Sequence, residues 1–129
     1  MIFRPFYRFE TGCAAYVVGC GGQGICCVVD PHEDDVDAYM KFAAGKAMRI
    51  AYVVDTHVHA DHRSGARALA EKSGARYALH RAADVRFAFE PLDDNQEIKL
   101  GNVLIRVLHT PGHTPESIAL VVSDLRRGP

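Results

Sequence analysis

An apolar run followed at once by a cluster of histidines is the feature that most limits how this chain can fold. The run Ile50–Val54 has the length and composition of a buried strand. Residues 57–62 then read His-Val-His-Ala-Asp-His, so four side chains of metal-binding type fall within six positions. A strand that ends here delivers all four to one edge of a sheet. We therefore expect a fold in which the rest of the chain completes a metal site at that edge.

The spacing within this first loop indicates how its side chains are shared between metal positions. In extended backbone, side chains two residues apart point to the same side, so His57 and His59 can reach one ion. Imidazole is neutral near pH 7 and binds Zn(II) or Fe(II) well. If a helix begins near Asp61, then Asp61 and His62 point toward a neighbouring position. The pattern suits two adjacent metals, or one metal with outer polar partners. Chance exposure of histidines beside a helix start is the alternative.

A second histidine loop follows another apolar strand. Residues 109–117 read His-Thr-Pro-Gly-His-Thr-Pro-Glu-Ser, and Pro111 with Gly112 favours a tight turn that presents His113. In layered α/β folds, functional groups gather outside the ends of the strands. His113 is therefore the expected third ligand, although a loop histidine that only bonds a carbonyl group would give the same local sequence.

The remaining candidates have simpler interpretations. His109 is expected to be a structural residue at the end of its strand, and His32 and His80 to be hydrogen-bonded or solvated. Asp30 ends an apolar run, where it can cap the following turn. Its second interpretation is as the acceptor for the N–H of a ligating imidazole.

Hydrophobic periodicity predicts strands that alternate with helices, which is typical of an α/β layered fold. Helices are expected over residues 33–46 and 64–72, the second ending at Gly74. Residues 81–96 are expected to form a helical turn and a loop. Hairpins are expected for 14–20 with 25–29 and for 97–100 with 103–108. The predicted strands cover residues 2–10, 14–20, 25–29, 50–54, 76–79, 97–100, 103–108 and 118–123.

Composition indicates which classes of partner and which cellular compartment are expected. The 129 residues suit one domain, and 15 basic against 16 acidic side chains give no indication of nucleic acid or an anionic membrane as a partner. No apolar run approaches the ~20 residues of a membrane span, and the N-terminus does not resemble a signal peptide. The four cysteines form no Cys-x-x-Cys pair. These features favour a cytoplasmic protein with reduced thiols.

The two loops together resemble a known family. Residues 56–62 resemble the Thr-His-x-His-x-Asp-His motif of the metallo-β-lactamase fold, with Asp30 at the family's early strand-end aspartate and His113 at its next metal histidine. The resemblance covers nearly all of the chain. Within the superfamily the chain is most similar to the persulfide dioxygenases (sulfur dioxygenases), relatives of glyoxalase II. The segments that carry this similarity are Thr11–Cys13, Asp30–Pro31, 59–65 and 109–117.

This resemblance implies a role for each matched residue. In persulfide dioxygenases, two histidines and one aspartate hold Fe(II), and the histidines correspond to His57 and His113. His59 would lie beside the iron, and it corresponds to a zinc ligand of glyoxalase II. Asp61 and His62 would be ligands of a second metal in the hydrolases and polar neighbours at the catalytic centre in the dioxygenases. The implied reaction oxidises glutathione persulfide, a small thiol-type substrate, to sulfite and releases glutathione.

Two alternatives remain open. One is a glyoxalase II-like Zn(II) hydrolase, in which a metal-bound hydroxide attacks a thioester. The other is a catalytically inactive fragment that binds metal. The family's aspartate ligand belongs to a Gly-Asp-Thr/Ala-Leu-Phe-like segment after the next strand, and no such segment precedes Pro129. Asp124 is not in the matching context. Whether the chain is an enzyme is therefore left open.

The resemblance also implies an αββα sandwich, of which residues 1–129 would form one metallo-β-lactamase-like domain truncated on its C-terminal side, a single sheet with its helices. The inner face of such a half would be uncovered. At ~25 cal/mol per Å2, several hundred Å2 of exposed apolar surface costs on the order of 10 kcal/mol. That is comparable with the whole stability of a small domain. We therefore expect a marginally stable chain, or a homodimer that covers the open sheet face.

Overall fold

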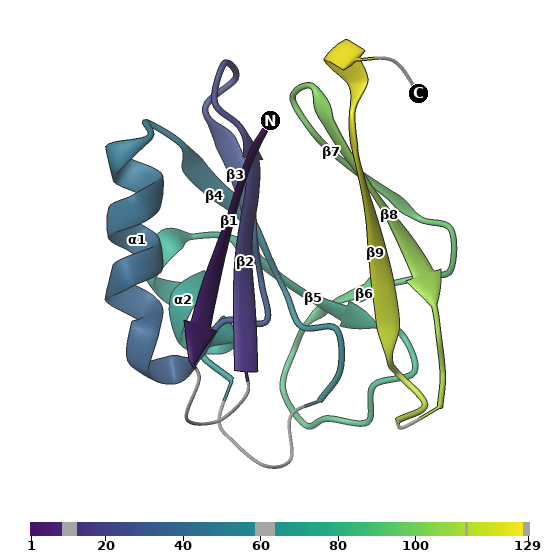
Figure 1. The fold of residues 1–129 in the computed structure, drawn as a ribbon. Helices are drawn as coiled ribbons and strands as arrows, with labels where there is room; N and C mark the ends of the chain where they lie inside the picture. Colours follow the sequence, from purple (N-terminus) through teal and green to yellow (C-terminus); the bar gives the residue numbers. More distant parts are fainter. Residues whose placement is uncertain (9–12, 59–63, 113, 128–129) are drawn as a thin grey trace.

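The computed structural model describes residues 1–8, 13–58, 64–112 and 114–127. Two helices lie on one face of a six-stranded sheet, and a three-stranded sheet packs against its other face (Figure 1). The predicted α/β layered class is confirmed. The arrangement corresponds to part of an αββα sandwich.

The six-stranded sheet has its strands in sequence order. The first three strands pair antiparallel, which confirms the predicted hairpin of residues 14–20 and 25–29. From the third strand onward the pairing is parallel, so the carboxyl ends of these strands meet at one edge. The strands are β1 (Ile2–Arg8), β2 (Cys13–Cys20), β3 (Ile25–Val29), β4 (Arg49–Val54), β5 (Arg76–His80) and β6 (Glu90–Leu92).

The helices begin and end close to the predicted residues. A 3-10 turn over Glu33–Asp35 leads into α1 (Val36–Gly45), and α2 covers Ala66–Ser73. Gly74 ends α2 with φ +75°, the left-handed conformation that glycine adopts without strain. The helices bury their apolar stripes against one face of the sheet. This core includes Val17, Cys26, Val28, Tyr39, Val53 and Leu69.

The second sheet consists of β7 (Glu97–Leu100), β8 (Val103–His109) and β9 (Ile118–Asp124), all antiparallel, followed by a 3-10 turn over Leu125–Arg127. The predicted hairpin of β7 and β8 is confirmed. Buried and exposed residues alternate along both strands, so one face of this sheet is apolar. That face packs on the inner face of the large sheet. The core between the sheets includes Val18, Val29, Val54, Leu92, Leu100, Val103, Ile105 and Val107.

The expectation for residues 81–96 was wrong in one respect, because this segment contains a strand. β6 pairs in parallel with β5 along Ala78–His80. Pro91 lies at the centre of β6, and a proline cannot donate a hydrogen bond to a ladder. It is compatible with this position because β6 is the edge strand of its sheet. A three-residue strand centred on proline carries almost no sequence signal.

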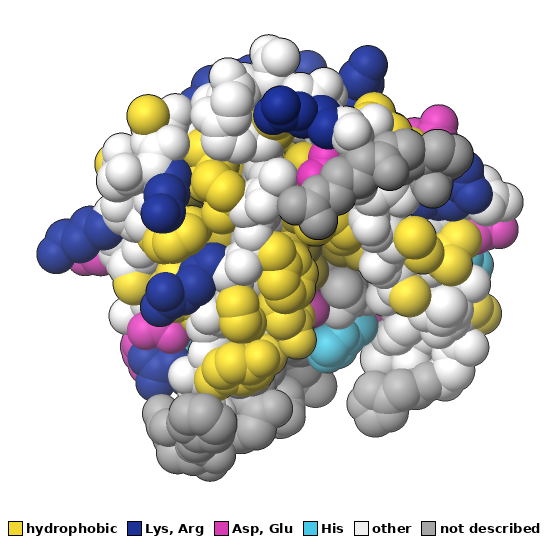
Figure 2. Space-filling view, turned by 45° about the horizontal axis from the view of Figure 1, so that its top comes forward, with side chains coloured by type: hydrophobic (Ala, Val, Ile, Leu, Met, Phe, Trp, Pro, Cys, Tyr) yellow, Lys and Arg dark blue, Asp and Glu magenta, His cyan; other side chains and the backbone are white. Residues whose placement is uncertain are grey.

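The uncovered inner face is smaller than the sequence predicts. The three-stranded sheet covers residues of β2 to β6, and the uncovered part is a cleft of about 310 Å3 between β1, β2 and β9. Figure 2 shows apolar side chains on both sides of a furrow on this face of the molecule. Phe3, which lies in β1, is 53% exposed there. The cleft is lined by Phe3, Tyr16, Val18, Val29, Asp30, Thr56, Leu120 and Val122.

The cysteine side chains that the structure describes all lie in the core. Cys20, Cys26 and Cys27 are buried and are not joined by disulfides. Burial raises the pKa of Cys26 to about 11, so this thiol stays protonated. Within the same part of the chain, no helix combines the length and apolar character needed to cross a bilayer.

Candidate metal centre

The entrance to the first histidine loop is held by Asp30. This residue follows β3 with φ 52°, a left-handed conformation that aspartate tolerates better than most residues. Its N–H donates to Val54 O at 2.8 Å, which continues the parallel pairing of β3 with β4. Its carboxylate then accepts the Thr56 N–H and the Thr56 hydroxyl, both at 2.7 Å. Through these bonds Asp30 fixes the residue that precedes His57, a role different from the predicted cap of the turn that follows Asp30.

The Thr56 hydroxyl also decides which nitrogen of His57 carries the proton. Thr56 Oγ1 lies 3.1 Å from His57 Nδ1. The hydroxyl has one hydrogen, and an ionised carboxylate can only accept, so that hydrogen is directed at Asp30. His57 Nδ1 must then donate to the hydroxyl, so that in the neutral imidazole Nε2 is the acceptor nitrogen. An imidazole oriented in this way presents Nε2 to a metal ion, and a hydrogen-bonded Nδ1–H is the usual arrangement for a ligating histidine. Asp30 therefore acts on His57 through Thr56.

The second histidine loop lies directly against the first. Ile118 N donates to Thr56 O at 2.9 Å, and Val58 N donates to Glu116 Oε2 at 2.9 Å. Glu116 is only 5% exposed. Burial opposes its ionisation, but hydrogen bonds from Thr114 and Val58 outweigh that effect and hold the pKa of Glu116 below its usual value. The carboxylate is therefore charged at neutral pH and bridges the two loops.

The exit of the first loop is fixed by a second acid. Asp55 is 2% exposed, and Ser64 Oγ lies 3.0 and 2.9 Å from its two carboxylate oxygens. The Tyr77 hydroxyl, from β5, donates to the same carboxylate at 2.9 Å. Burial, and then the charge of Asp55, raise the pKa of Tyr77, so its hydroxyl remains a donor. Ser64 Oγ also accepts the N–H of Ala66 in the first turn of α2.

The segment after β3 packs against the same exit. Gly65 N donates to Pro31 O at 2.7 Å, and His32 forms an isolated bridge with Ser64. A side chain at Gly65 would place its Cβ 2.6 Å from His32 O. Only glycine permits this close approach of two backbones. Both ends of the first loop are therefore tied to the residues that follow β3.

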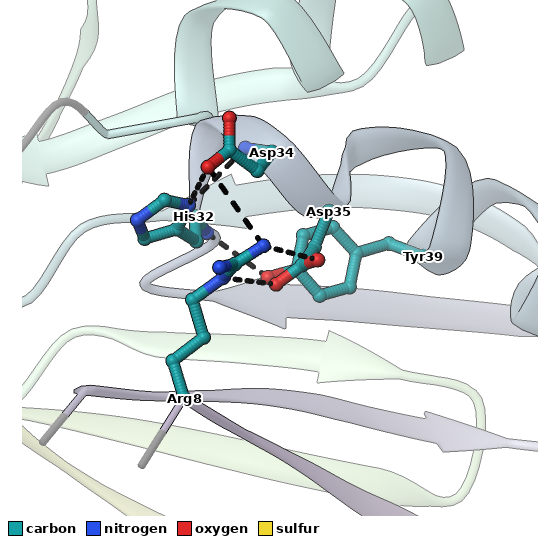
Figure 3. Close-up of polar contacts among 5 residues, drawn as sticks. All are labelled: Arg8, His32, Asp34, Asp35 and Tyr39. Atoms are coloured by element: carbon teal, nitrogen blue, oxygen red, sulfur yellow. Dashed lines mark hydrogen bonds and ion pairs between the residues drawn. The ribbon is translucent and has the colours of Figure 1, made fainter. Parts of the chain in front are cut away.

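A polar cluster supports this segment from the side of α1 (Figure 3). Arg8 binds Asp35 through two parallel hydrogen bonds of 2.9 Å. The Tyr39 hydroxyl accepts the His32 N–H at 2.9 Å, and His32 Nδ1 accepts the Asp34 N–H at 3.1 Å. His32 is therefore hydrogen-bonded, as the sequence predicts. The cluster fixes the end of β1 and the start of the first helical turn.

Four of the five predicted metal ligands lie outside the described residues. These are His59, Asp61, His62 and His113. Among the residues that the structure does describe, no three His, Cys, Asp or Glu side chains gather as metal ligands would. The structure does bring His57 and the backbone beside it against residues 116–118. The sequence analysis gave no role to the residues that hold these loops, which are Asp55, Ser64, Tyr77 and Glu116.

Two other histidines form a contact between the sheets. His80, at the end of β5, and His109, at the end of β8, stack with ring centroids 3.7 Å apart and an interplanar angle of 11°. His80 Nδ1 accepts the Ala82 N–H at 3.0 Å, and His109 Nε2 lies 2.8 Å from Pro115 O. Both are structural residues, in agreement with the sequence analysis.

This pair predicts a pH-dependent stability. Burial, and then the nearby His109, lower the pKa of His80 below its ordinary value. An unfolded histidine has a pKa near ~6.5, so as the pH falls below that value the unfolded chain binds this proton more readily than the folded chain. The contribution is present above that pH and is lost as the pH falls toward the lower pKa of the folded state. Urea unfolding of the metal-free chain at pH 7.5 and 5.5 should therefore show a loss of stability at pH 5.5 that is smaller in His80→Asn. An equal loss in the variant would contradict the assignment.

Comparison with known proteins identifies the family. The family model described as the metallo-beta-lactamase superfamily matches residues 8–126. The chain belongs to the metallo-beta-lactamase superfamily. Members of this superfamily typically bind metal ions, and the orientation of His57 fits that property. The match also agrees with the fold, in which the histidine motif follows a parallel strand at one end of the sheets.

Individual relatives of the superfamily cover most of this chain. A hydroxyacylglutathione hydrolase of Anaeromyxobacter dehalogenans is 36% identical over 114 residues, which are 88% of this chain and 43% of that protein. A probable metallo-hydrolase of Burkholderia pseudomallei is 29% identical over 96% of this chain and 52% of its own length. The chain thus spans about half the length of the curated relatives it matches.

Solved structures give the same result. A metallo-beta-lactamase from Staphylococcus aureus superimposes with a TM-score of 0.90 and 33% identity, covering 98% of this chain and 39% of that one. ETHE1 from Myxococcus xanthus superimposes with a TM-score of 0.87 and 30% identity, covering 95% of this chain and 54% of that one. The backbone arrangement of the superfamily is therefore present over nearly the whole chain.

Proposed function

We propose that this chain, as one metallo-β-lactamase-like domain over residues 1–129, carries the histidine centre of a metal-dependent enzyme that acts on a glutathione-linked substrate, of the persulfide dioxygenase type. The single observation that carries the proposal is the chain of hydrogen bonds from His57 through Thr56 to Asp30. These bonds fix the orientation of the His57 ring and keep its proton on Nδ1. Nε2 of the neutral ring can then bind a metal ion. A histidine that served only the fold would not need this orientation.

The proposed ligands are His57 and His113, joined by His59 where the metal is zinc, with Asp61 and His62 beside them at the catalytic centre. The bonds from Val58 and Ile118 to the opposite loop support the convergence of residues 57 and 113, because both loops are tied together within a few residues of these positions. When bound, Fe(II) supplies open coordination positions for a thiolate and O2, and Zn(II) supplies a water of lowered pKa.

The residues of the chain have three roles in this proposal. Asp30 and Thr56 hold the His57 ring and its proton on Nδ1. Glu116 holds the backbone at Val58, and Asp55 holds the loop exit at Ser64. In the overall reaction, the terminal sulfur of glutathione persulfide takes two oxygen atoms from O2 and one from water, and leaves as sulfite with release of glutathione.

A thioester hydrolase of the glyoxalase II type, with Zn(II) at the site, is the second candidate. The observation that favours it is the 36% identity with a hydroxyacylglutathione hydrolase. In that case Asp61 and His62 would serve a second metal. The name of that relative indicates a hydroxyacylglutathione substrate, so the two candidates would share a glutathione-containing substrate.

Metal content and substrate turnover separate these candidates. The chain is reconstituted anaerobically with Fe(II) or with Zn(II), desalted and analysed for bound metal, and then given glutathione persulfide with O2 or an acylglutathione thioester. About one iron per chain with O2 consumption and sulfite release supports the dioxygenase. Two zinc ions with thioester cleavage support the hydrolase. No metal above background after either loading would overturn both and indicate a fragment without catalytic function.

A further inference from the structure

Glu116 is a buried acid that crosses from one histidine loop to the other. Its side chain is 5% exposed and belongs to the segment just before β9. Its Oε2 accepts the Val58 N–H at 2.9 Å. Val58 lies between two of the proposed ligands in sequence, so the acceptor reaches the backbone at the centre of the histidine motif.

The hydrogen bonds of Glu116 leave its side chain little freedom. It accepts from Val58 and from the Thr114 side chain, and its own backbone N–H also contributes. A buried carboxylate without such partners would be very costly, whereas N–H bonds to a charged acceptor are among the strongest in proteins. The residue is therefore a rigid connection and not a flexible surface acid.

A second bond runs parallel to this connection. Ile118 N donates to Thr56 O at 2.9 Å, so the same two segments are joined on either side of His57. Fixing the N–H of Val58 fixes the plane of the peptide between residues 57 and 58. That plane sets the direction in which the His57 side chain leaves the backbone. The Thr56 hydroxyl then sets the rotation of its ring.

We propose that Glu116 is a positioning residue that holds the two histidine loops at the separation required for metal binding. The inference rests on the proposed metal function, and it assigns a role to a residue that is not itself a ligand. It acts through the backbone of Val58, so an isosteric side chain with an acceptor oxygen should replace it. A residue that only stabilised the fold would affect unfolding without affecting metal affinity.

The test measures metal binding and unfolding in the same variants. Co(II) is titrated into the metal-free chain in competition with a chelator, the visible absorption bands are recorded, and thermal unfolding is followed without metal. We expect Glu116→Ala to weaken Co(II) binding about 10–100-fold, as loss of an outer partner typically does, and to change the bands. Glu116→Gln should bind within about threefold of the parent, since its amide oxygen still accepts the Val58 N–H.

Val103→Ala is the matched control. Val103 is buried at the far end of β8, by the turn from β7. It should lower the unfolding midpoint while Co(II) affinity and bands stay as in the parent. The proposal is overturned if Glu116→Ala binds Co(II) like the parent, or if Glu116→Gln loses as much Co(II) affinity as Glu116→Ala. It is also overturned if Val103→Ala loses as much Co(II) affinity as Glu116→Ala. His57→Ala separates failure of the proposed metal function from failure of the positioning role of Glu116. If it loses binding and Glu116→Ala does not, only the positioning role fails, whereas a parent chain that binds no Co(II) removes both.

Discussion

His57→Ala is expected to abolish tight metal binding by this chain. Structural zinc sites obtain about 10–16 kcal/mol from four ligands, so one ligand carries about 3 kcal/mol, which is more than a hundredfold in affinity. The alanine also removes the donor to Thr56 Oγ1, but Asp30 still accepts both Thr56 bonds. The backbone at the loop entrance should therefore persist. Isothermal titration with Zn(II) under chelator competition measures the loss, and His113→Ala should show a loss of similar size.

The control for this experiment is His80→Ala. His80 is stacked on His109 between the sheets and accepts the Ala82 N–H, so its removal should leave metal affinity intact even if it lowers stability. Circular dichroism of the three metal-free variants shows whether each is folded. Equal loss of metal binding in all three would mean that these histidines act through folding, and the metal proposal would fail.

Asp55→Ala is expected to cause the largest loss of stability among the loop residues. The substitution leaves the hydroxyl groups of Ser64 and Tyr77 without their acceptor in a partly buried place. Each unsatisfied donor costs about 1–3 kcal/mol, so the free energy of unfolding should fall by about 3 kcal/mol or more. For a chain of this size that corresponds to a thermal midpoint lower by about 10 °C or more. Differential scanning calorimetry of the metal-free chain measures the shift.

Asp55→Asn is the matched variant for this prediction. Its side-chain oxygen can still accept from Ser64 or Tyr77, so the thermal midpoint should lie between those of the parent and Asp55→Ala. Tyr77→Phe removes one of the two donors together with its hydrogen bond and should have a smaller effect than Asp55→Ala. A midpoint for Asp55→Ala within about 2 °C of the parent would contradict a supporting role for the network.

The strands that alternate or run apolar over several residues were predictable from sequence. The period of two in β7 and β8, and the apolar runs of β3 and β4, have few other interpretations. β6 was missed because three residues around Pro91 have no period, and only pairing with β5 makes them a strand. The covering of the inner face by the second sheet was also missed. It depends on how the two sheets stack, which local periodicity does not contain.

The metal motif was predictable because its residue types and their spacing are those of metal ligands. The residues that hold it were not. Asp55 and Glu116 look like ordinary acids beside a threonine and a proline, and their importance comes from burial and from the distant partners Tyr77 and Val58. A weak signal existed at Asp55, an acid that directly follows a fully apolar strand. Nothing in the sequence indicated that Thr56 would lie between Asp30 and His57.

The stacking of the two sheets has a kinetic consequence. Val29 and Val54 come from the first half of the chain and pack with Leu100 and Ile105 from the second half. These contacts close a long loop of the chain, and closing it costs chain entropy. The free energy gained by burying the apolar side chains comes only after that cost, which slows folding. Refolding should therefore take milliseconds to seconds rather than microseconds, as in other topologies rich in non-local strand contacts. The helices on the outer face can form earlier, so the layer between the sheets should be the last to exclude water.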